Sequence, residues 1–271
     1  MNIRVRGISY HLNSQIKDNA PSLILLHGFL GSGLVFNPLK SHLDSDISVT
    51  TIDLLGHGST EGAELHYRFS TKEQVADLSK LISEQLPSPV FLYGYSMGAR
   101  LALQLALCRP DLIQGLILES GSFGIEKETE RQARQALDAS RADQIQGNFH
   151  GFLEKWKTMK IFDGNLQSES KRLLMNIQEK QNHYWMANSL LGFGSGTMPC
   201  IKDRLNELIS PVQLIVGAHD VKFLRINQSM KKNISDCELA IIEDANHRVH
   251  LEQPKKCATI INQFITNHSP S

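Results

Sequence analysis

The pentapeptide at positions 94–98, Gly-Tyr-Ser-Met-Gly, has residue types and spacing that predict nucleophilic or base chemistry. It follows the apolar run 90–93 and precedes the helix-like segment 99–106. This order predicts a strand, a sharp turn and a helix, which is the context of a nucleophile elbow. The two glycines allow a tight turn that holds the serine in a strained conformation with its hydroxyl exposed. We therefore predict that Ser96 is a reactive hydroxyl.

A serine hydroxyl is a poor nucleophile or base unless an imidazole takes its proton and a carboxylate orients that imidazole. In folds with this elbow, the chain order is serine, acid, histidine. Asp220 follows the apolar run 212–216, and His247 follows the run 239–242. Open α/β sheets place their sites at the carboxyl ends of the strands. We therefore expect Ser96, Asp220 and His247 to meet at one edge of the sheet.

Neighbouring residues compete for two of these roles. His250 lies three positions after His247, where the chain is expected to enter the final helix, and Asp244 is an alternative acid. His219 lies beside Asp220 and is consistent with a surface loop. We favour His247 and Asp220 because of their positions after predicted strands.

A developing oxyanion requires N–H donors that are already in place. The backbone N–H of Met97, directly after the serine, is one candidate, and that of Phe29 in the glycine-rich loop 27–33 is the other. The same loop could instead bind a phosphate, but it lacks the Lys-Ser/Thr ending of a P-loop and the spacing of a dinucleotide motif. His27 is expected to brace this loop, and His57 to shape a glycine turn.

Six apolar runs alternate with helix-like segments, which predicts an α/β fold with a mostly parallel, doubly wound sheet. The first dozen residues are expected to form an antiparallel hairpin at the edge. The runs cover 23–26, 49–52, 90–93, 116–118, 212–216 and 239–242.

The segment 122–208 has no convincing buried strand and is rich in polar residues and leucine at helical spacing. We predict that it is a helical cap over the site, inserted into a core formed by residues 1–121 and 209–271. The alternative is a helical elaboration that makes no contact with the chemistry.

The composition excludes several classes of partner. Lys plus Arg equals Asp plus Glu at 28 each, so no basic surface for nucleic acid or an anionic membrane is indicated. No apolar run approaches the roughly 18 residues of a membrane helix, and the N-terminus lacks the apolar segment of a secretory signal. We expect a cytoplasmic protein, a monomer or small homo-oligomer.

No metal or organic cofactor is expected, because no cluster of ligating residues has the required spacing. The four cysteines also lack metal or redox spacing. We expect them to be reduced and mostly buried in the core. They are Cys108, Cys200, Cys237 and Cys257.

With these motifs the chain resembles the α/β-hydrolase superfamily over nearly its whole length. The motifs lie at 27–29, 53–59, 94–100, 217–220 and 246–254. Three further stretches resemble one branch, the 2-succinyl-6-hydroxy-2,4-cyclohexadiene-1-carboxylate synthases of menaquinone biosynthesis. These stretches are 94–100, 119–124 continuing to 130–134, and 220–223.

This resemblance implies a lyase that retains a hydrolase triad. The substrate, 2-succinyl-5-enolpyruvyl-6-hydroxy-3-cyclohexene-1-carboxylate, loses a proton and its enolpyruvyl group leaves as pyruvate. Ser96, activated by His247 and Asp220, would act as a base and would not be acylated. The N–H groups of Phe29 and Met97 would stabilise the oxyanion that forms on the succinyl carbonyl.

The implied substrate is a small tricarboxylate. The planar guanidinium of an arginine can donate two parallel hydrogen bonds to a carboxylate. Arg100 lies one helical turn after Ser96, so it can face the same cavity. The resemblance implies that Arg134 and Lys222 hold substrate carboxylates and that Trp156 and Tyr95 contact the substrate. The alternative for each cation is a solvated surface charge.

One position departs from this branch. Gln178 stands where the family usually has a second cap arginine, and Lys180 or Arg172 are possible substitutes. The fold supports many chemistries, so two other functions stay open. One is a serine hydrolase of esters or vinylogous carbon–carbon bonds. The other is a non-catalytic ligand-binding member.

Overall fold

The computed structural model describes residues 1–269, and its centre is an eight-stranded sheet in the order β1-β2-β4-β3-β5-β6-β7-β8. The strands from β4 to β8 in this order pair in parallel, whereas β1–β2 and β2–β4 are antiparallel. The mostly parallel sheet and the N-terminal edge hairpin are therefore as predicted. The strands are β1 (Asn2–Val5), β2 (Ile8–Gln15), β3 (Ser22–Leu26), β4 (Ser48–Ile52), β5 (Val90–Tyr95), β6 (Ile113–Glu119), β7 (Val212–Gly217) and β8 (Cys237–Ile242).

Alternating side chains of the inner strands enter two separate cores. Leu23 and Leu25 of β3 belong to one core, and Ile24 and Leu26 belong to the other. All four are fully buried. Because both faces of the strand are covered, its sequence is a continuous apolar run with no alternation of polar residues.

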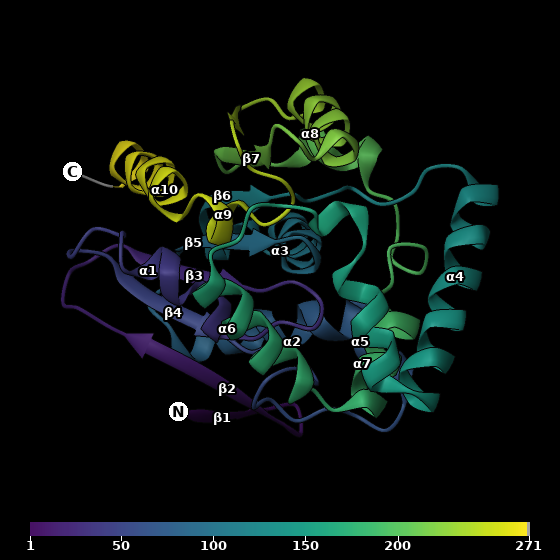
Figure 1. Cartoon of the computed structure of the whole chain (residues 1–271). Helices are drawn as coiled ribbons and strands as arrows, with labels where there is room; N and C mark the ends of the chain where they lie inside the picture. Colours follow the sequence, from purple (N-terminus) through teal and green to yellow (C-terminus); the bar gives the residue numbers. More distant parts are fainter. Residues whose placement is uncertain (270–271) are drawn as a thin grey trace.

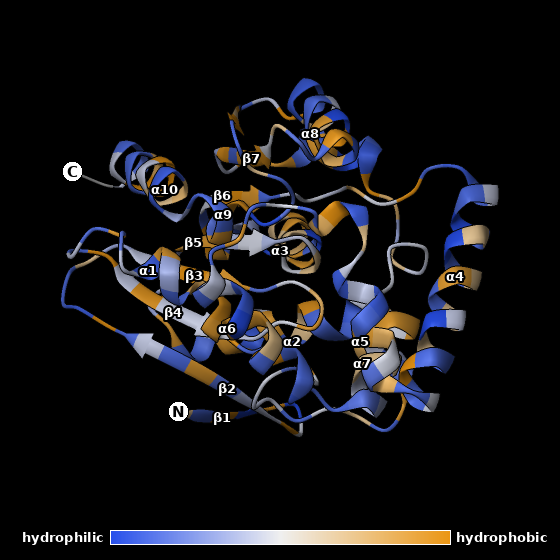
Figure 2. Cartoon of the chain, in the orientation of Figure 1, coloured by the Kyte–Doolittle hydropathy of each residue, from blue (hydrophilic) through white to orange (hydrophobic). Residues whose placement is uncertain are grey.

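Helices cover both faces of the sheet. One core includes residues of α2, α3 and α8, and the other includes residues of α1, α9 and α10. In Figure 2, β6 and α3 are largely hydrophobic in colour, whereas α4 is mostly hydrophilic. The α-helices are α1 (Asn37–Lys40), α2 (Thr71–Gln85), α3 (Met97–Cys108), α4 (Glu128–Gly147), α5 (Phe149–Lys157), α6 (Ser168–Glu179), α7 (His183–Phe193), α8 (Val221–Asn233), α9 (Val249–Glu252) and α10 (Pro254–His268).

Helices α4 to α7 form the connection between β6 and β7, and this connection contains no strand in the described chain. Figure 1 shows α4, α5 and α7 together, on the side to which the arrowheads of β5 and β6 point. Residues of α4, α5 and α7 share a third apolar core, which also includes Leu30 from the loop after β3. The inserted helices therefore pack against a loop at the carboxyl edge of the sheet.

The cysteine expectation was partly wrong. All four cysteines are free, but Cys257 alone among them is buried. Cys108 is the last residue of α3 and is exposed, and Cys237 begins the edge strand β8 and is half-buried. Their positions at the ends of elements, which the sequence pattern did not define, explain the difference.

Membrane-spanning helices and metal-binding clusters are both absent from residues 1–269. No helix within residues 1–269 is long and apolar enough to cross a bilayer. Within the same range, no group of three or more His, Cys, Asp or Glu side chains is arranged to hold a metal ion.

Candidate active site

Ser96 occupies the sharp turn between β5, which ends at Tyr95, and α3, which begins at Met97. Its φ is 52° and its ψ is −102°, a backbone conformation that L-residues rarely adopt. Both flanking positions require glycine, because neighbouring backbone atoms lie too close to leave room for a Cβ atom. A Cβ at Gly94 would lie 2.5 Å from the carbonyl oxygen of Gly98, and a Cβ at Gly98 would lie 2.2 Å from that of Leu26.

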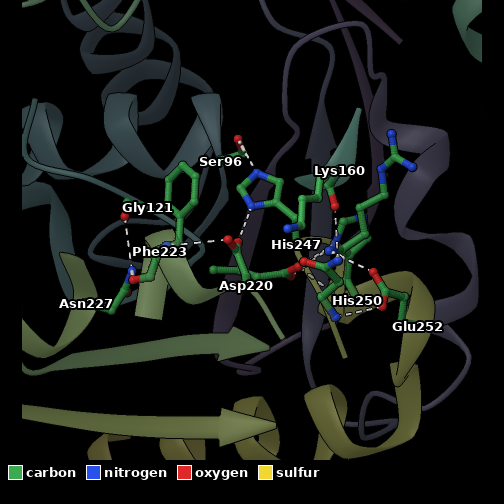
Figure 3. Close-up of polar contacts among 12 residues, drawn as sticks. Ser96, Gly121, Lys160, Asp220, Phe223, Asn227, His247, His250 and Glu252 are labelled. Carbon is green, nitrogen blue, oxygen red and sulfur yellow. Dashed lines mark hydrogen bonds and ion pairs between the residues drawn. The ribbon is translucent and has the colours of Figure 1, made fainter. Parts of the chain in front are cut away.

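Ser96, His247 and Asp220 form a hydrogen-bonded chain, which is visible in Figure 3. His247 Nε2 lies 3.0 Å from Ser96 Oγ, and His247 Nδ1 lies 2.5 Å from Asp220 Oδ2. Asp220 also caps α8, since its Oδ1 accepts a hydrogen bond from the N–H of Phe223 at 3.4 Å. His247 and Asp220 are both buried. The arrangement can draw a proton from Ser96 onto the imidazole while the carboxylate fixes the tautomer.

The competing residues lie outside this chain of hydrogen bonds. His250 is fully buried, and its Nδ1 bonds to the carboxylate of Glu119 at 2.9 Å. His219 and Asp244 are both exposed. The geometry therefore supports the choice of His247 and Asp220 over these neighbours.

A carboxylate that the sequence analysis missed holds the backbone on both sides of His247. Glu252 Oε2 accepts the N–H of Asn246 at 2.7 Å, and Oε1 accepts the N–H of Arg248 at 3.1 Å. Figure 3 shows Glu252 beside this loop. Its spacing of five residues after His247 was visible in the sequence, but nothing there indicated which groups it would bind.

The two predicted oxyanion donors face the same cavity as Ser96. Met97 is the first residue of α3, so its N–H has no acceptor within the helix. The loop that carries Phe29 is braced by His27, whose Nε2 accepts the N–H of Leu54 at 2.9 Å and whose Nδ1 donates to Gly28 O at 2.8 Å. Burial lowers the pKa of His27 to about 4, so the imidazole is neutral near pH 7. His27 has the bracing position that was predicted.

His57 lies in the same buried group. Its ring centroid is 5.2 Å from that of His27 and 5.9 Å from that of Phe29. Its Nδ1 donates to Leu55 O at 2.9 Å. Burial, followed by the charge of His27, lowers the pKa of His57 to about 3. These contacts agree with a loop-shaping residue.

A cavity of about 370 Å³ adjoins Ser96 and His247, and it is lined by an excess of positive charge. The lining includes every residue that was predicted for the triad, the oxyanion donors and substrate contacts. One carboxylate, that of Asp220, lines the cavity and is already bonded to His247. The basic residues in the lining are Arg100, Arg134, Arg141, Lys222 and Arg248.

Arg100 has no carboxylate within 4 Å among residues 1–269. Its Nη1 donates to Phe193 O at 3.0 Å, and its guanidinium lies 4.8 Å from the centre of the Phe193 ring. Burial, together with the charge of Arg134, lowers the pKa of Arg100 to about 9. An anion in the cavity would relieve this unfavourable burial of charge.

Arg134 and Lys222 differ from Arg100 in their surroundings. Arg134 Nε lies 2.9 Å from both carboxylate oxygens of Asp138, so its charge is partly neutralised. Lys222 is exposed at the rim of the cavity, where the surrounding protein and the charge of Arg134 lower the pKa of its ammonium. The three predicted cations therefore face one cavity with different degrees of compensation.

The aromatic residues predicted to contact the substrate are also in the lining. The ring of Trp156 packs edge-on to Phe29 at 5.5 Å and lies 5.3 Å from Phe162. The ring of Tyr95 lies 5.5 Å from that of His247. Gln178 lines the cavity too, whereas its possible substitutes Lys180 and Arg172 do not.

A family model described as the alpha/beta hydrolase family matches residues 23–260 of the chain. The chain belongs to the alpha/beta hydrolase family. The family predicted from the motifs is therefore confirmed, together with its fold.

Relatives of this alpha/beta hydrolase share the name that the motifs suggested. A Bacillus subtilis (strain 168) protein, 33% identical over 96% of each chain, bears the provisional name 2-succinyl-6-hydroxy-2,4-cyclohexadiene-1-carboxylate synthase. A Serratia proteamaculans (strain 568) protein with that synthase name is 28% identical over 91% of this chain and 94% of its own. The solved structure of MenH from S. aureus matches with a TM-score of 0.90 and 27% identity, over 96% of this chain and 98% of that one.

The structure of this alpha/beta hydrolase adds two cavity cations that the sequence analysis missed. Arg141 lies 3.6 Å from Asp138 Oδ1, with its guanidinium 5.6 Å from the centre of the Trp156 ring. Arg248 follows His247 directly and lies 3.8 Å from the centre of the Phe162 ring. One sequence signal indicated these two cations, which was the position of Arg248 beside His247. No signal indicated Arg141.

Proposed function

We propose that this chain is a lyase of menaquinone biosynthesis. It eliminates pyruvate from 2-succinyl-5-enolpyruvyl-6-hydroxy-3-cyclohexene-1-carboxylate and releases 2-succinyl-6-hydroxy-2,4-cyclohexadiene-1-carboxylate. The names of the relatives, at 33% and 28% identity over nearly the whole chain, support this reaction.

The observation that carries the proposal is the combination of the Ser96 triad with an adjoining cavity rich in basic residues. Arg100 is the key member, because it is partly buried without a carboxylate partner in residues 1–269. A substrate with three carboxylates would compensate this charge, whereas a neutral substrate would leave it uncompensated. The cavity thus fits a small polycarboxylate.

The chemistry begins with removal of the ring proton at C2, which is acidic because it is adjacent to the succinyl carbonyl. Ser96 Oγ takes this proton as its own proton passes to His247 Nε2, and Asp220 stabilises the imidazolium that forms. The electron pair moves onto the succinyl carbonyl oxygen, where the N–H groups of Phe29 and Met97 donate to it.

Collapse of this enolate shifts the ring double bond and breaks the bond between C5 and the enolpyruvyl oxygen. The ring then holds two conjugated double bonds, and the enolpyruvate takes up one proton and becomes pyruvate. No covalent bond to Ser96 forms. The cations hold the substrate carboxylates so that the C2 proton lies beside Ser96 Oγ, which is a contribution of orientation.

The experiment is coupled detection of pyruvate and the diene from freshly generated substrate. Wild type should release pyruvate much faster than the spontaneous reaction, and both Ser96→Ala and Arg100→Ala should lose most of this rate. Arg225→Ala, on the exposed side of α8 and outside the cavity lining, is the matched control and should keep it. Wild-type release at the spontaneous rate, or full activity of Ser96→Ala, would disprove the proposal.

A serine hydrolase of esters or vinylogous carbon–carbon bonds is the second candidate. The strained elbow and the Ser96–His247 hydrogen bond favour this hydrolase as much as they favour the lyase, because acyl transfer uses the same groups. The two reactions differ in their need for cavity charge. Ester hydrolysis by an acyl-enzyme, unchanged in Arg100→Ala, would support the hydrolase.

A further inference from the structure

Arg248 is a cavity cation with a location of its own. It follows β8 and His247, whereas Arg100, Arg134 and Arg141 come from α3 and α4. Burial, followed by the charge of Arg134, lowers the pKa of Arg100, Arg141 and Lys222, so these three basic side chains lie within electrostatic range of Arg134. Arg248 instead contacts Phe162, and its charge acts on the hydroxyl of Tyr95. The cavity thus has a second positively charged region.

The surroundings of Arg248 leave its charge uncompensated. The residue is 8% exposed, and no carboxylate lies within 4 Å of its guanidinium in the described part of the chain. The nearby carboxylate of Glu252 accepts the backbone N–H groups of Asn246 and Arg248. A largely buried cation without an acid is costly unless a ligand supplies the opposite charge.

Phe162 holds this guanidinium in place. The guanidinium lies 3.8 Å from the centre of the ring, within the range of a cation–π contact. The Phe162 ring in turn lies 5.3 Å from that of Trp156 and 5.9 Å from that of His247. Arg248, Phe162 and Gln178 all line the cavity that contains Ser96. A planar guanidinium stacked in this way keeps its N–H edge available for two parallel bonds to a carboxylate.

We infer that Arg248, stacked on Phe162, is a second carboxylate-binding subsite, separate from the one formed by Arg100, Arg134 and Lys222. It binds one carboxylate of a substrate whose other carboxylates occupy the first group. This inference rests on the proposed function for the identity of the substrate, but the subsite itself requires only a polycarboxylate ligand. The substrate class is therefore one with carboxylates on two separated arms.

The first test is steady-state pyruvate release by Arg248→Gln, which keeps the backbone N–H that bonds to Glu252. Loss of a charge-assisted bond predicts a KM for the tricarboxylate about 10- to 100-fold higher, with kcat within about threefold of wild type. Arg248→Lys keeps the charge but loses the planar guanidinium, so its KM should lie between those of wild type and Arg248→Gln. Phe162→Leu should raise KM less than Arg248→Gln does, because the cation remains. Arg225→Gln, an exposed arginine on α8, is the matched control and should leave KM unchanged.

The second test needs no turnover and separates the two proposals. Binding of propane-1,2,3-tricarboxylate is measured by isothermal titration calorimetry at low ionic strength. Wild type and Arg225→Gln should bind it with equal affinity, and Arg248→Gln should bind it about tenfold or more weakly. If wild type fails to release pyruvate while this difference persists, the lyase proposal fails and the subsite stands.

Three results would overturn the subsite, two of which concern binding. One is an Arg248→Gln variant with unchanged KM and unchanged tricarboxylate binding. The other is wild-type protein that binds no tricarboxylate and shows no dependence of KM on Arg248. A fall in kcat alone, with KM unchanged, would also overturn it, because this would indicate that Arg248 only supports the His247 loop.

Discussion

The residues that line the cavity form two groups, which we call its complete side and its charged side because of their partners and not their location. In the complete side, Ser96, His247 and Asp220 serve as hydrogen-bond partners for one another. In the charged side, Arg100 and Lys222 have no carboxylate within 4 Å in residues 1–269, and Arg134 shares Asp138 with Arg141. The first group is complete without a ligand, and the second is not. We therefore propose that the triad supplies the reactivity that the alpha/beta hydrolase fold offers to many substrates, and that the uncompensated cations select among these substrates.

The largest expected effect on catalysis comes from disrupting the hydrogen bonds among Ser96, His247 and Asp220. Asp220→Asn removes the charge that orients His247 and stabilises its imidazolium, while the amide keeps an oxygen to cap α8. We expect kcat for pyruvate release to fall by about 10⁴-fold, the scale of this substitution in other triads. A thermal midpoint close to that of wild type would show that the fold is intact. Retention of most of the activity would mean that Asp220 is not the functional acid.

A second prediction concerns the neutral histidines behind the oxyanion loop. The pKa of His57 is lowered to about 3 in the folded protein, against about 6.5 for an unperturbed histidine. Between pH 6.5 and 4 the unfolded chain therefore binds a proton that the folded protein does not. Stability consequently falls as the pH falls through this range. At about 1.4 kcal/mol per pKa unit, His57 alone accounts for about 3 kcal/mol between pH 7 and 4.

Urea unfolding of wild type and His57→Gln at pH 7 and pH 4 measures this contribution. We expect the loss of unfolding free energy on acidification to be about 3 kcal/mol smaller in the variant. His219→Gln is the matched control, since His219 is exposed, and it should follow wild type. Parallel pH profiles for wild type and His57→Gln would contradict the prediction.

A third prediction compares two arginines that differ in their partners. Arg100→Met should raise KM for the tricarboxylate by about 10- to 100-fold. It should change the free energy of unfolding by less than about 1 kcal/mol, because an uncompensated buried charge adds little stability. Arg68 bonds to the buried carboxylate of Asp77 at 2.8 Å and lies outside the cavity lining. Arg68→Met should therefore destabilise the protein by about 2 to 4 kcal/mol and leave KM unchanged.

Chemical denaturation and steady-state kinetics of Arg100→Met and Arg68→Met test this third prediction. A stability loss in Arg100→Met as large as that in Arg68→Met would show that Arg100 is a structural residue. The contrast between the two sides of the cavity would then disappear.

These two sides also differ in how far the sequence predicted them. Ser96, Asp220 and His247 each lie within five residues after an apolar run, and parallel strands bring such positions to one edge of a sheet. Their meeting was therefore predictable from local pattern. Phe29 and Met97 were found in the same way, from a loop and an elbow with defined geometry. Their functional roles stay predictions.

The charged side was harder to predict because its residues come from helices and loops that meet only through tertiary packing. Arg141 lies on α4, and its sequence does not distinguish it from a solvated helix position such as Gln132. Arg248 was part of a recognised motif, but its partner Phe162 lies 86 positions earlier in the chain. Only the packing of the inserted helices over the sheet edge brings such residues together. The contacts of Glu252 with the His247 loop also depend on tertiary packing, so no sequence pattern indicated them.

The smallest expected effect separates two cations of the charged side by their exposure. Lys222 is exposed at the rim of the cavity, whereas Arg100 is partly buried. Coulomb interactions near bulk water are weak and are screened by salt. Lys222→Gln should therefore raise KM only about threefold at low ionic strength, and the difference from wild type should vanish at about 0.5 M salt. The increase in KM caused by Arg100→Met should persist at the same salt concentration, because a buried charge is screened much less. Equal salt dependence of the two variants would mean that both cations meet the substrate in solvent, and burial of Arg100 would then have no part in selecting it.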